Sequence, residues 1–267
     1  MEQNPRIVFD PEKCVRCGLC VQDCVSRAIR LTDTGIACVR PCLECGHCVA
    51  ICPRGAVSIP SQDMDEVVAY QPETFTLPPE NLANAIKYRR SVRAFAPQPV
   101  DPAVLREILQ AGRYAPTAKN VQGMRFLALQ AELPAFKQAF WDAMPEIVAW
   151  HEARGTGYGP TFARFYEKYQ EKGRDAFFMD APAALILAGG SHWDAGVAAG
   201  NMELMCCAHG LGALHDGYLQ QALLACPRLL APYGMDDVPV CACLLAGRPK
   251  RRYARTAPRK PAHLLVR

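Results

Sequence analysis

Two runs of closely spaced cysteines constrain this chain more than any other feature of its sequence. CVRCGLCVQDC, residues 14–24, places four thiols at steps of 3, 3 and 4, and CLECGHCVAIC, residues 42–52, repeats those steps. Steps of three bring successive thiolates around one small centre, and the step of four carries the last thiolate away on a short helix. The chain has 14 cysteines, and its N-terminus has no signal-peptide pattern. We therefore expect a cytoplasmic protein whose thiols are reduced and bind metal.

The double run resembles the C-x2-C-x2-C-x3-C pattern of two-cluster bacterial ferredoxins, in which the fourth cysteine of each run ligates the other cluster. The resemblance covers residues 1–60 and implies two [4Fe–4S] clusters that carry single electrons. The implied ligands are Cys14, Cys17, Cys20 and Cys52 for one cluster, and Cys42, Cys45, Cys48 and Cys24 for the other. Pro53 follows the second run as in that family, whereas Val25 follows the first. The alternative is two zinc sites, but zinc ligands are usually spaced as two separated pairs.

Length and charge set further bounds. The chain has 267 residues, enough for one large or two smaller domains, and half of them are apolar, as in a globular protein. Its 30 basic and 26 acidic residues are nearly balanced, so we expect no nucleic-acid partner. The sequence has no apolar run of the roughly 18 residues that a membrane helix needs, so we expect no membrane association. The basic excess gathers in RPKRRYARTAPRK near the C-terminus, either as an anion site or as a solvated tail.

The composition changes after the second cysteine run. Residues 61–80 are rich in proline and acidic residues and have little periodicity, so we interpret them as a linker between a domain over 1–60 and one over 81–267. In the second domain, Asn81, Asp101 and Asp194 are candidate helix caps. Short apolar runs at 125–130, 183–189 and 240–247 are typical of strands. Helices and strands alternate without a regular βαβ rhythm, which predicts an α+β fold with a mixed sheet flanked by helices.

The sequence carries no convincing nucleotide-binding motif. The sequence has no Walker A loop, and the GxGxG at residues 155–159 lies between helical stretches rather than after a strand. A dinucleotide fingerprint is therefore not expected there.

The second domain resembles the nitroreductase family of FMN enzymes. RRSVRAFAPQPV, residues 89–100, resembles the family's R-x-S-x-R-x-F…P-V opening. Four further stretches agree in order: AGRYAPTAKNVQGMRF, DAPAALILAG, AAGNMELMCCAHGLGALHDGYL and VPVCACLLAGRPKRRYARTAPRKP. Each motif alone is weak, but five in order are specific, and they cover residues 81–267.

The resemblance implies an FMN site with named residues. Arg89, Arg90, Ser91 and Arg93 would bind the FMN phosphate through charge-assisted hydrogen bonds, with Arg255 and Arg259 of the basic tail closing its other side. Asn120, with Gln122 beside it, would meet the pyrimidine edge of the flavin, because a carboxamide has both a donor and an acceptor. Asp216 and Gly217 would lie near the flavin N5, where glycine allows close approach. Taken singly, an arginine-rich turn is more often a solvated surface, and an asparagine a turn residue.

Other residues have two interpretations each. His215 adjoins the predicted flavin turn and is a candidate proton donor, or a solvated histidine. Gly123-Met124 replaces the family's usual Pro-Trp, which puts the pocket wall there in doubt. Rings at helical spacing in residues 142–178 form either core or a roof over the flavin. Six cysteines lie outside the ligand pattern and are expected to be reduced thiols: Cys38, Cys206, Cys207, Cys226, Cys241 and Cys243.

The two halves together predict an enzyme in which two clusters feed electrons to FMN. The donor would be a reduced ferredoxin or NAD(P)H, and the acceptor an electron-poor small molecule such as a nitroaromatic, a quinone or an activated alkene. The family resemblance also implies a homodimer, and the helix over 194–209, rich in small residues, suits close packing. Two alternatives are an electron carrier that passes electrons to a partner protein and a specific reductive dehalogenase or ring reductase.

Overall fold

The computed structural model describes residues 6–33 and 35–267, which divide into two compact units. Unit 1 extends to Leu77 and also contains Thr117–Val121, and unit 2 contains Pro78–Pro116 and Gln122–Arg267. The chain therefore leaves unit 1, enters unit 2, returns to unit 1 for five residues and then completes unit 2. Among the described residues, none of the helices is long and apolar enough to cross a membrane.

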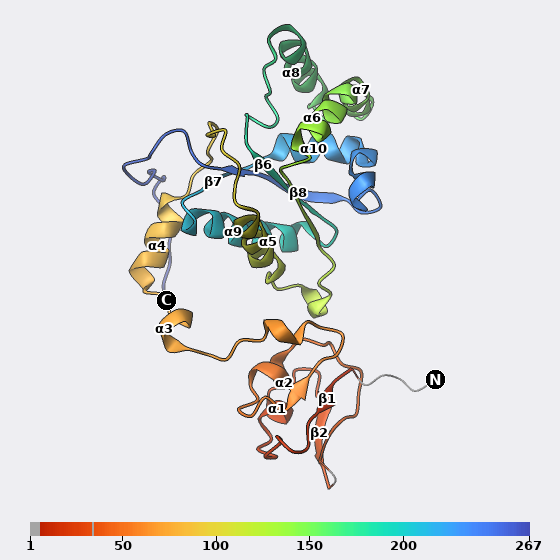
Figure 1. Ribbon diagram of the computed structural model, residues 1–267, viewed down its shortest axis with the longest axis vertical. Helices are drawn as coiled ribbons and strands as arrows, with labels where there is room; N and C mark the ends of the chain where they lie inside the picture. Colours follow the sequence, from red (N-terminus) through yellow and green to blue (C-terminus); the bar gives the residue numbers. More distant parts are fainter. Residues whose placement is uncertain (1–5, 34) are drawn as a thin grey trace. The chain divides into compact units, whose positions relative to one another are not determined.

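Unit 1 is built from short elements around the two cysteine runs (Figure 1). β1 (Val8–Phe9) pairs antiparallel with β4 (Val57–Ser58), and β2 (Ile29–Thr32) pairs with β3 (Gly35–Cys38). Each cysteine run contains a single-turn helix, α1 (Leu19–Gln22) or α2 (His47–Ala50). The stretches that follow the two cysteine runs contain the start of β2 and the whole of β4.

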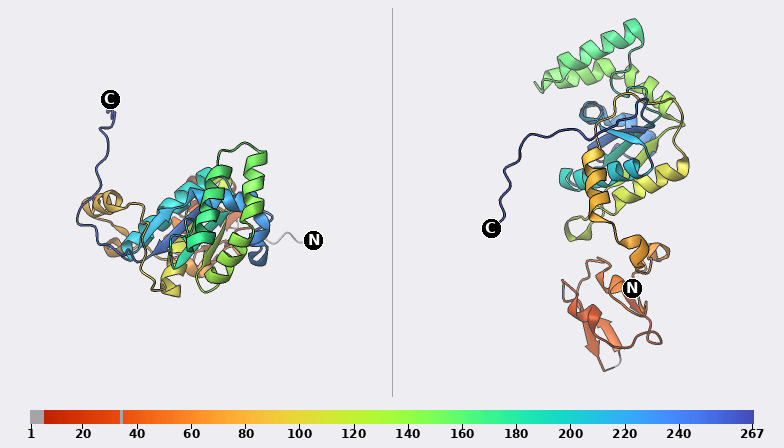
Figure 2. Two further views of the ribbon diagram at one scale, coloured as in Figure 1. Left: turned by 90° about the horizontal axis from the view of Figure 1, so that it is seen from above. Right: turned by 90° about the vertical axis from the view of Figure 1, so that its left-hand side faces the viewer.

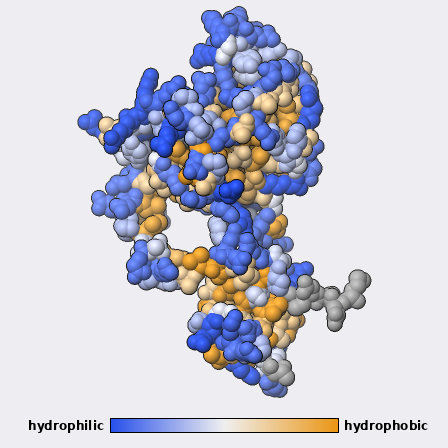
Figure 3. Space-filling view, in the orientation of Figure 1, coloured by the Kyte–Doolittle hydropathy of each residue, from blue (hydrophilic) through white to orange (hydrophobic). Residues whose placement is uncertain are grey.

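The core of unit 1 is small and rich in thiols. Its buried members are Ile7, Ile29, Cys48 and Val57, and Cys20, Cys24, Cys42 and Cys52 pack against them. Hydrophobic residues reach the surface of this unit (Figure 3). Val15 and Val25, for example, are 60% and 73% exposed. So small an apolar core stabilises a fold weakly, so whatever the thiols bind contributes to the stability of unit 1.

Three further short helices lie outside the cysteine runs of unit 1. They are η1 (Met64–Glu66), α3 (Pro72–Phe75) and η2 (Ala118–Asn120), and the first two lie within or beside the predicted linker. η2 carries a run of left-handed backbone, with φ of 54° at Lys119 and 55° at Asn120.

Unit 2 is a four-stranded sheet with helices on both faces (Figures 1 and 2). The strand order is β5 (Arg125–Leu129), β6 (Ala183–Ala188), β8 (Val240–Gly247) and β7 (Gly212–His215), all paired antiparallel. A parallel bridge between Ser91 and Ala213 adds to the β7 edge. Because all six β6 residues are buried, successive side chains of this strand fill the two opposite cores.

Each face of the sheet has its own helical layer. One layer contains α5 (Pro102–Arg113) and α9 (His192–Ala208), with α4 (Pro79–Tyr88) against α9. The other contains α6 (Leu133–Asp142), α7 (Met144–Ala153), α8 (Gly159–Lys172), α10 (Gly217–Ala225) and η3 (Pro227–Tyr233). The α+β class predicted from the sequence is confirmed.

Two of the three predicted helix caps are wrong. The Asp101 side chain does cap α5, by accepting from Ala103 N. α4, however, begins at Pro79 rather than after Asn81, because proline has the φ of a first helical residue. The cap of α9 is Ser191, and Asp194 stands three residues later, where its carboxylate accepts from the Ser191 N–H in a capping box.

Candidate functional site

The two cysteine runs repeat the same backbone geometry. Arg16 and Glu44, each just before the second cysteine of its run, have left-handed φ of 56° and 52°. Gly18 and Gly46, each just after it, have φ of 77° and 76° and begin the single-turn helices. Two left-handed residues around one cysteine curl the chain into a tight loop, and glycine adopts this φ without a steric cost.

The structure brings together the four thiols predicted for one cluster. A single pocket in unit 1 is lined by Cys14, Cys17 and Cys20 of the first run and by Cys52 of the second. Its other lining residues include Phe9, Ile36 and Val57, so the four thiols face an apolar surface. This donor set, three thiols from one run and the last from the other, fits an iron–sulfur cluster of the ferredoxin type.

The thiols predicted for the second cluster are also close enough to interact electrostatically. Burial raises the pKa of Cys42, and the nearby thiols of Cys38, Cys45 and Cys24 raise it further. Burial likewise raises the pKa of Cys48 to about 11, with Cys42 and Cys45 adding to the shift. Over the described residues, no group of three or more His, Cys, Asp or Glu side chains has the geometry to hold a single metal ion.

In unit 2 the predicted phosphate residues follow α4 and are fixed to the sheet. Val92 N donates to Ala213 O of β7 at 2.9 Å. This places Arg89 and Arg90 on a cavity of about 390 Å³. Three further arginines line the cavity: Arg248, Arg251 and Arg252. Such a volume is within the usual range for small-molecule sites, and five guanidinium groups suit an anionic ligand.

The two arginines predicted from the basic tail lie at the protein surface. Arg255 and Arg259 are exposed, and neither lines the cavity. Arg255 contacts Arg90 through its backbone carbonyl, which accepts a hydrogen bond from Arg90 Nη2 at 2.6 Å. The Arg90 guanidinium also lies over the ring of Tyr253, 4.3 Å from the ring centroid. The cavity arginines at 248, 251 and 252 were missed, although the RPKRR run directly after a strand was the signal for them.

A second missed residue, Glu203 of α9, links two predicted ones. Its Oε2 lies 2.5 Å from Arg89 Nη1 and 3.4 Å from His215 Nε2. Hydrogen bonding from His215 and the charge of Arg89 outweigh burial and lower the pKa of Glu203. The buried Nε of Arg89 has no hydrogen-bond partner among the described residues, so one N–H remains for an anion.

Asp216 and Gly217 form the turn between β7 and α10. Asp216 Oδ1 caps α10 by accepting from Leu219 N at 2.9 Å, whereas the buried Oδ2 has no partner in the described chain. Burial raises the pKa of Asp216 to about 6, and the charge of Arg93 partly offsets this rise. No heavy atom lies within 4 Å of where a Cβ on Gly217 would stand, so its backbone is open to close approach.

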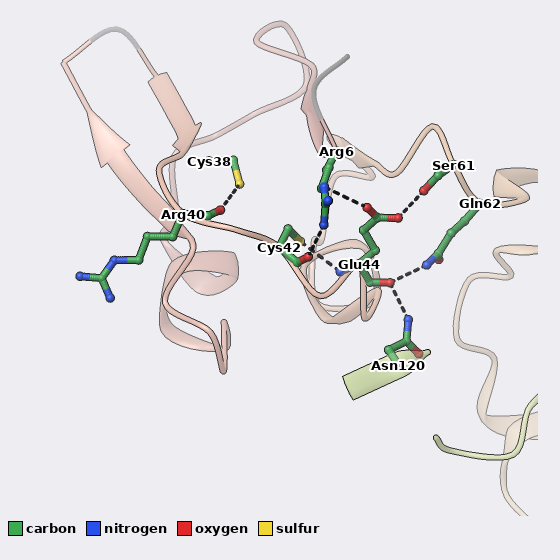
Figure 4. A network of polar contacts seen from close by, with 8 residues as sticks. All are labelled: Arg6, Cys38, Arg40, Cys42, Glu44, Ser61, Gln62 and Asn120. Atoms are coloured by element: carbon green, nitrogen blue, oxygen red, sulfur yellow. Dashed lines mark hydrogen bonds and ion pairs between the residues drawn. The ribbon is translucent and has the colours of Figure 1, made fainter. Parts of the chain in front are cut away.

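Asn120 and Gln122 fall in different units. Asn120 belongs to unit 1, where its Nδ2 donates to Glu44 O at 2.8 Å (Figure 4). Gln122 begins the second segment of unit 2 and has a left-handed φ of 48°.

The rings of the variable region pack mainly into the core. Phe162 is fully buried, and Trp141 stacks on Tyr169 at 4.0 Å. The same cluster includes Tyr218, which follows Gly217 in the sequence. The ring centroids of Tyr218 and Phe165 lie 5.5 Å apart. The core role therefore holds, and Tyr218 extends the cluster to the turn that is predicted to meet the flavin.

Comparison with protein families agrees with this geometry. The model of the nitroreductase family matches residues 86–248, which is more than half of the chain. The chain belongs to the nitroreductase family. A 4Fe-4S dicluster domain model matches residues 6–53. The chain is thus a flavin oxidoreductase of this family with an N-terminal ferredoxin-like domain.

Solved structures share the fold of unit 2. A nitroreductase with bound FMN from Bacteroides fragilis is 18% identical, with a TM-score of 0.57 over 70% of this chain and 98% of its own. A nitroreductase with bound FMN from Desulfitobacterium hafniense is 19% identical, with a TM-score of 0.52 over 71% and 100%. A BluB-like flavoprotein from Clostridium difficile is 18% identical, with a TM-score of 0.51 over 67% and 94%. At these identities the likeness concerns the fold.

Proposed function

We propose that unit 2 binds FMN and reduces an electron-poor small molecule, and that unit 1 carries two [4Fe–4S] clusters that supply the electrons. The observation that carries the flavin site is the arginine-lined cavity of about 390 Å³ at one end of β7, with the Asp216–Gly217 turn at the other end. The four residues of β7 span roughly 10 Å. An anionic group at one end and an open backbone at the other suit a cofactor with a phosphate and a ring system.

The phosphate end is held by positive charge. Arg89 donates its unpaired Nε N–H, and Glu203 keeps the Arg89 guanidinium in place from its other side. Arg90, Ser91 and Arg93 add donors from the same turn, with Arg255 and Arg259 of the tail as further proposed contacts. Charge-assisted hydrogen bonds of this kind are roughly twice as strong as neutral ones.

At the ring end, Asp216 holds the N-terminus of α10 and thereby fixes the Gly217 N–H that faces the flavin. Asn120 and Gln122 are the proposed contacts of the pyrimidine edge. FMN, when bound, supplies hydride transfer and connects one-electron with two-electron chemistry. His215, whose Nε2 lies 3.4 Å from Glu203 Oε2, is the proposed proton donor to the product.

The electron inlet is the pair of cysteine sets in unit 1, Cys14, Cys17, Cys20 and Cys52 together with Cys42, Cys45, Cys48 and Cys24. We propose a low-potential one-electron donor such as reduced ferredoxin, either alongside NAD(P)H or in its place, and a cytoplasmic location where thiols stay reduced. Nitroaromatics, quinones and activated alkenes are the proposed acceptors.

We also propose a homodimer. None of the residues of α4 is buried. Leu82 and Ile86, which lie one turn apart on the same face of this helix, are 39% and 46% exposed. Leu264, Leu265 and Val266 of the tail are also exposed. A second copy of the chain would cover such apolar surface.

The test is anaerobic stopped-flow of the protein loaded with clusters and FMN. Flavin bleaching is followed with NADH, NADPH and reduced ferredoxin in separate mixes, for the wild type and for Cys52→Ala. Bleaching by ferredoxin that the cysteine change slows at least tenfold is the expected result. Rapid bleaching by a nicotinamide that Cys52→Ala leaves unchanged would contradict the inlet, and so would a chain without residues 1–60 that is reduced normally by every donor.

Product analysis then distinguishes a broad reductase from a specific reductase and from an electron carrier. Turnover of several acceptor classes supports a broad reductase, and turnover of a single halogenated or aromatic metabolite would support the specific reductase. Reduction of a partner protein with no small-molecule turnover would indicate an electron carrier.

A further inference from the structure

The chain that follows β8 is tied to the segment that follows α4, and both segments belong to unit 2. Ala96 N donates to Arg248 O at 2.8 Å. Lys250 N donates to Ala94 O at 2.9 Å. These two backbone hydrogen bonds fix residues 248–250 beside the turn that carries the predicted phosphate residues.

Further along the chain, the end of α4 holds the C-terminal segment a second time. Tyr88, the last residue of α4, donates from its hydroxyl group to Tyr253 O at 2.7 Å. Arg90 Nη2 donates to Arg255 O at 2.6 Å. The C-terminal segment passes α4 at this point (Figure 1). Residues 251–255, which we call the strap, are thus held at both ends.

The Arg90 guanidinium holds the strap with its face as well as with its edge. Its Cζ lies 4.3 Å from the ring centroid of Tyr253 and 5.7 Å from that of Tyr88. A planar guanidinium stacks on a ring while it donates hydrogen bonds in its own plane, whereas the ammonium group of lysine is a compact charge without a flat face. Arg90 therefore does more in this turn than add a positive charge.

The strap carries two of the arginines that line the cavity. Arg251 and Arg252 stand between the two places at which the C-terminal segment is held. Residues 251–267, all of which the structure describes, contain no helix or strand. The strap is therefore kept beside the cavity by the contacts of Tyr88 and Arg90 rather than by secondary structure of its own.

We propose that Tyr88 and Arg90 are positioning residues that hold the strap against the arginine-lined cavity, so that Arg251 and Arg252 retain the anionic end of the bound cofactor. The inference rests on the proposed function, in which this cavity binds the FMN phosphate. Ordering a segment of chain costs conformational entropy, and a strap that is ordered in advance spares the ligand this cost. A strap held in this way slows the release of FMN.

Two variants each weaken one contact of the strap. Tyr88→Phe removes the hydroxyl group that donates to Tyr253 O and changes no charge. Arg90→Lys keeps the positive charge but loses the flat face over Tyr253. Lys260→Ala is the matched control, because it removes a positive charge from the same C-terminal segment, outside the strap and outside the cavity lining. All three variants are made in the full chain.

The first readout needs no FMN. In the cluster-loaded chain without FMN, trypsin cleavage within the strap, after Arg251 and Arg252, measures how often the strap opens. Cleavage is expected to be about fivefold faster in Tyr88→Phe, the effect of losing one hydrogen bond, and at least tenfold faster in Arg90→Lys. Arg154, exposed at the end of α7, is the internal control and is expected to be cut at an unchanged rate. Unchanged cleavage of the strap in both variants would overturn its attachment to α4.

The second readout is the release of FMN. The protein loaded with clusters and FMN is diluted, and the fluorescence of the released FMN gives the dissociation rate constant. This constant is expected to rise in proportion to strap opening, about fivefold in Tyr88→Phe and at least tenfold in Arg90→Lys, and to stay unchanged in Lys260→Ala.

The two readouts together separate positioning from direct binding. Faster FMN release in Arg90→Lys with unchanged strap cleavage would overturn the positioning role, because Arg90 would then act on the phosphate itself. Faster cleavage with unchanged release would overturn the retention of FMN by the strap. A wild type that binds no FMN refutes the proposed function and the retention with it, while the cleavage rates still decide whether α4 holds the strap.

Discussion

Glu203 shows at the residue scale how a buried acid serves an anion site. It neutralises Arg89 while leaving the Arg89 Nε free, so the guanidinium stays oriented before any ligand arrives. The side chains of Arg89 and Glu203 are only 21% and 16% exposed, so solvent screens their interaction weakly. We expect Glu203→Gln to lower the free energy of unfolding by about 2 kcal/mol, measured by urea denaturation at pH 7.

The pH dependence of Glu203→Gln provides its control. The folded state lowers the pKa of Glu203, so the ionised carboxylate stabilises the fold above its unfolded pKa of about 4.3. That stabilisation is lost as the pH falls through the lower folded value. The difference between wild type and variant is therefore expected to shrink from pH 6 to pH 3. A difference that is constant over this range would rule out an ionic role for Glu203.

Asp216 behaves in the opposite way, because burial raises its pKa to about 6. Between about pH 4 and pH 6 the unfolded chain loses this proton and the folded chain keeps it, so rising pH destabilises the FMN-free fold. Asp216→Asn keeps the cap on α10 but cannot ionise. We expect the variant to be more stable than the wild type at pH 7.5 by about 1–3 kcal/mol and similar to it at pH 4.

Urea denaturation of the FMN-free protein at both pH values measures this effect. Asp216→Ala is the control for the cap, since it removes both the charge and the hydrogen bond to Leu219 N. Its expected gain at pH 7.5 is smaller by about 1 kcal/mol. Equal stability of Asp216→Asn and wild type at pH 7.5 would show that the ionised carboxylate is not disfavoured by burial.

At the scale of elements, α9 has two different faces. One packs on α5 so closely that a Cβ at Gly112 would stand 2.7 Å from Met202 Sδ. The other carries Gly196 and Gly200, one turn apart, with no atom within 4 Å of either Cβ position. If the second copy of the proposed dimer packs on this open face of α9, Gly196→Leu is expected to weaken the dimer at least tenfold and leave the monomer folded.

Sedimentation equilibrium and circular dichroism measure those two outcomes. Gly112→Ala is the contrasting variant, because its methyl group meets Met202 inside one chain. It is expected to destabilise the monomer by about 1–3 kcal/mol, the usual cost of overpacking. A dimer that tolerates Gly196→Leu places the interface elsewhere, for instance on α4.

At the scale of the whole molecule, the sequence predicts local structure well and distant contacts poorly. The buried runs of β6 and β8 and the repeated cysteine steps are local patterns, and the structure contains both strands and the pocket of Cys14, Cys17, Cys20 and Cys52. Glu203 was missed because an acid inside a helix is usually solvated. β7 was missed because four residues after a glycine turn have too little periodicity to stand out.

The return of residues 117–121 to unit 1 had no local signature either. Nothing in AKN, the residues of η2, marks a hydrogen bond to a residue 76 positions earlier in the chain. Such a contact depends on how the whole chain folds, so neither periodicity nor spacing predicts it. A chain without residues 1–60 therefore still contains residues 117–121 of unit 1.

That chain path makes the two units respond differently to loss of the clusters. The core cluster of unit 1 has only four buried members, one of which is the thiol Cys48, so we expect the stability of unit 1 to depend on cluster binding. Chelation of iron in the full chain is expected to unfold unit 1 and to leave unit 2 folded around its own two cores. Limited trypsin digestion measures this, with cleavage after Lys119 rising at least tenfold. Lys172, exposed at the end of α8 in unit 2, is the internal control and is expected to be cut at an unchanged rate. Equal acceleration at both sites would mean that the chain unfolds as one cooperative body, and protection at Lys119 after chelation would mean that the protein alone holds residues 117–121 in unit 1.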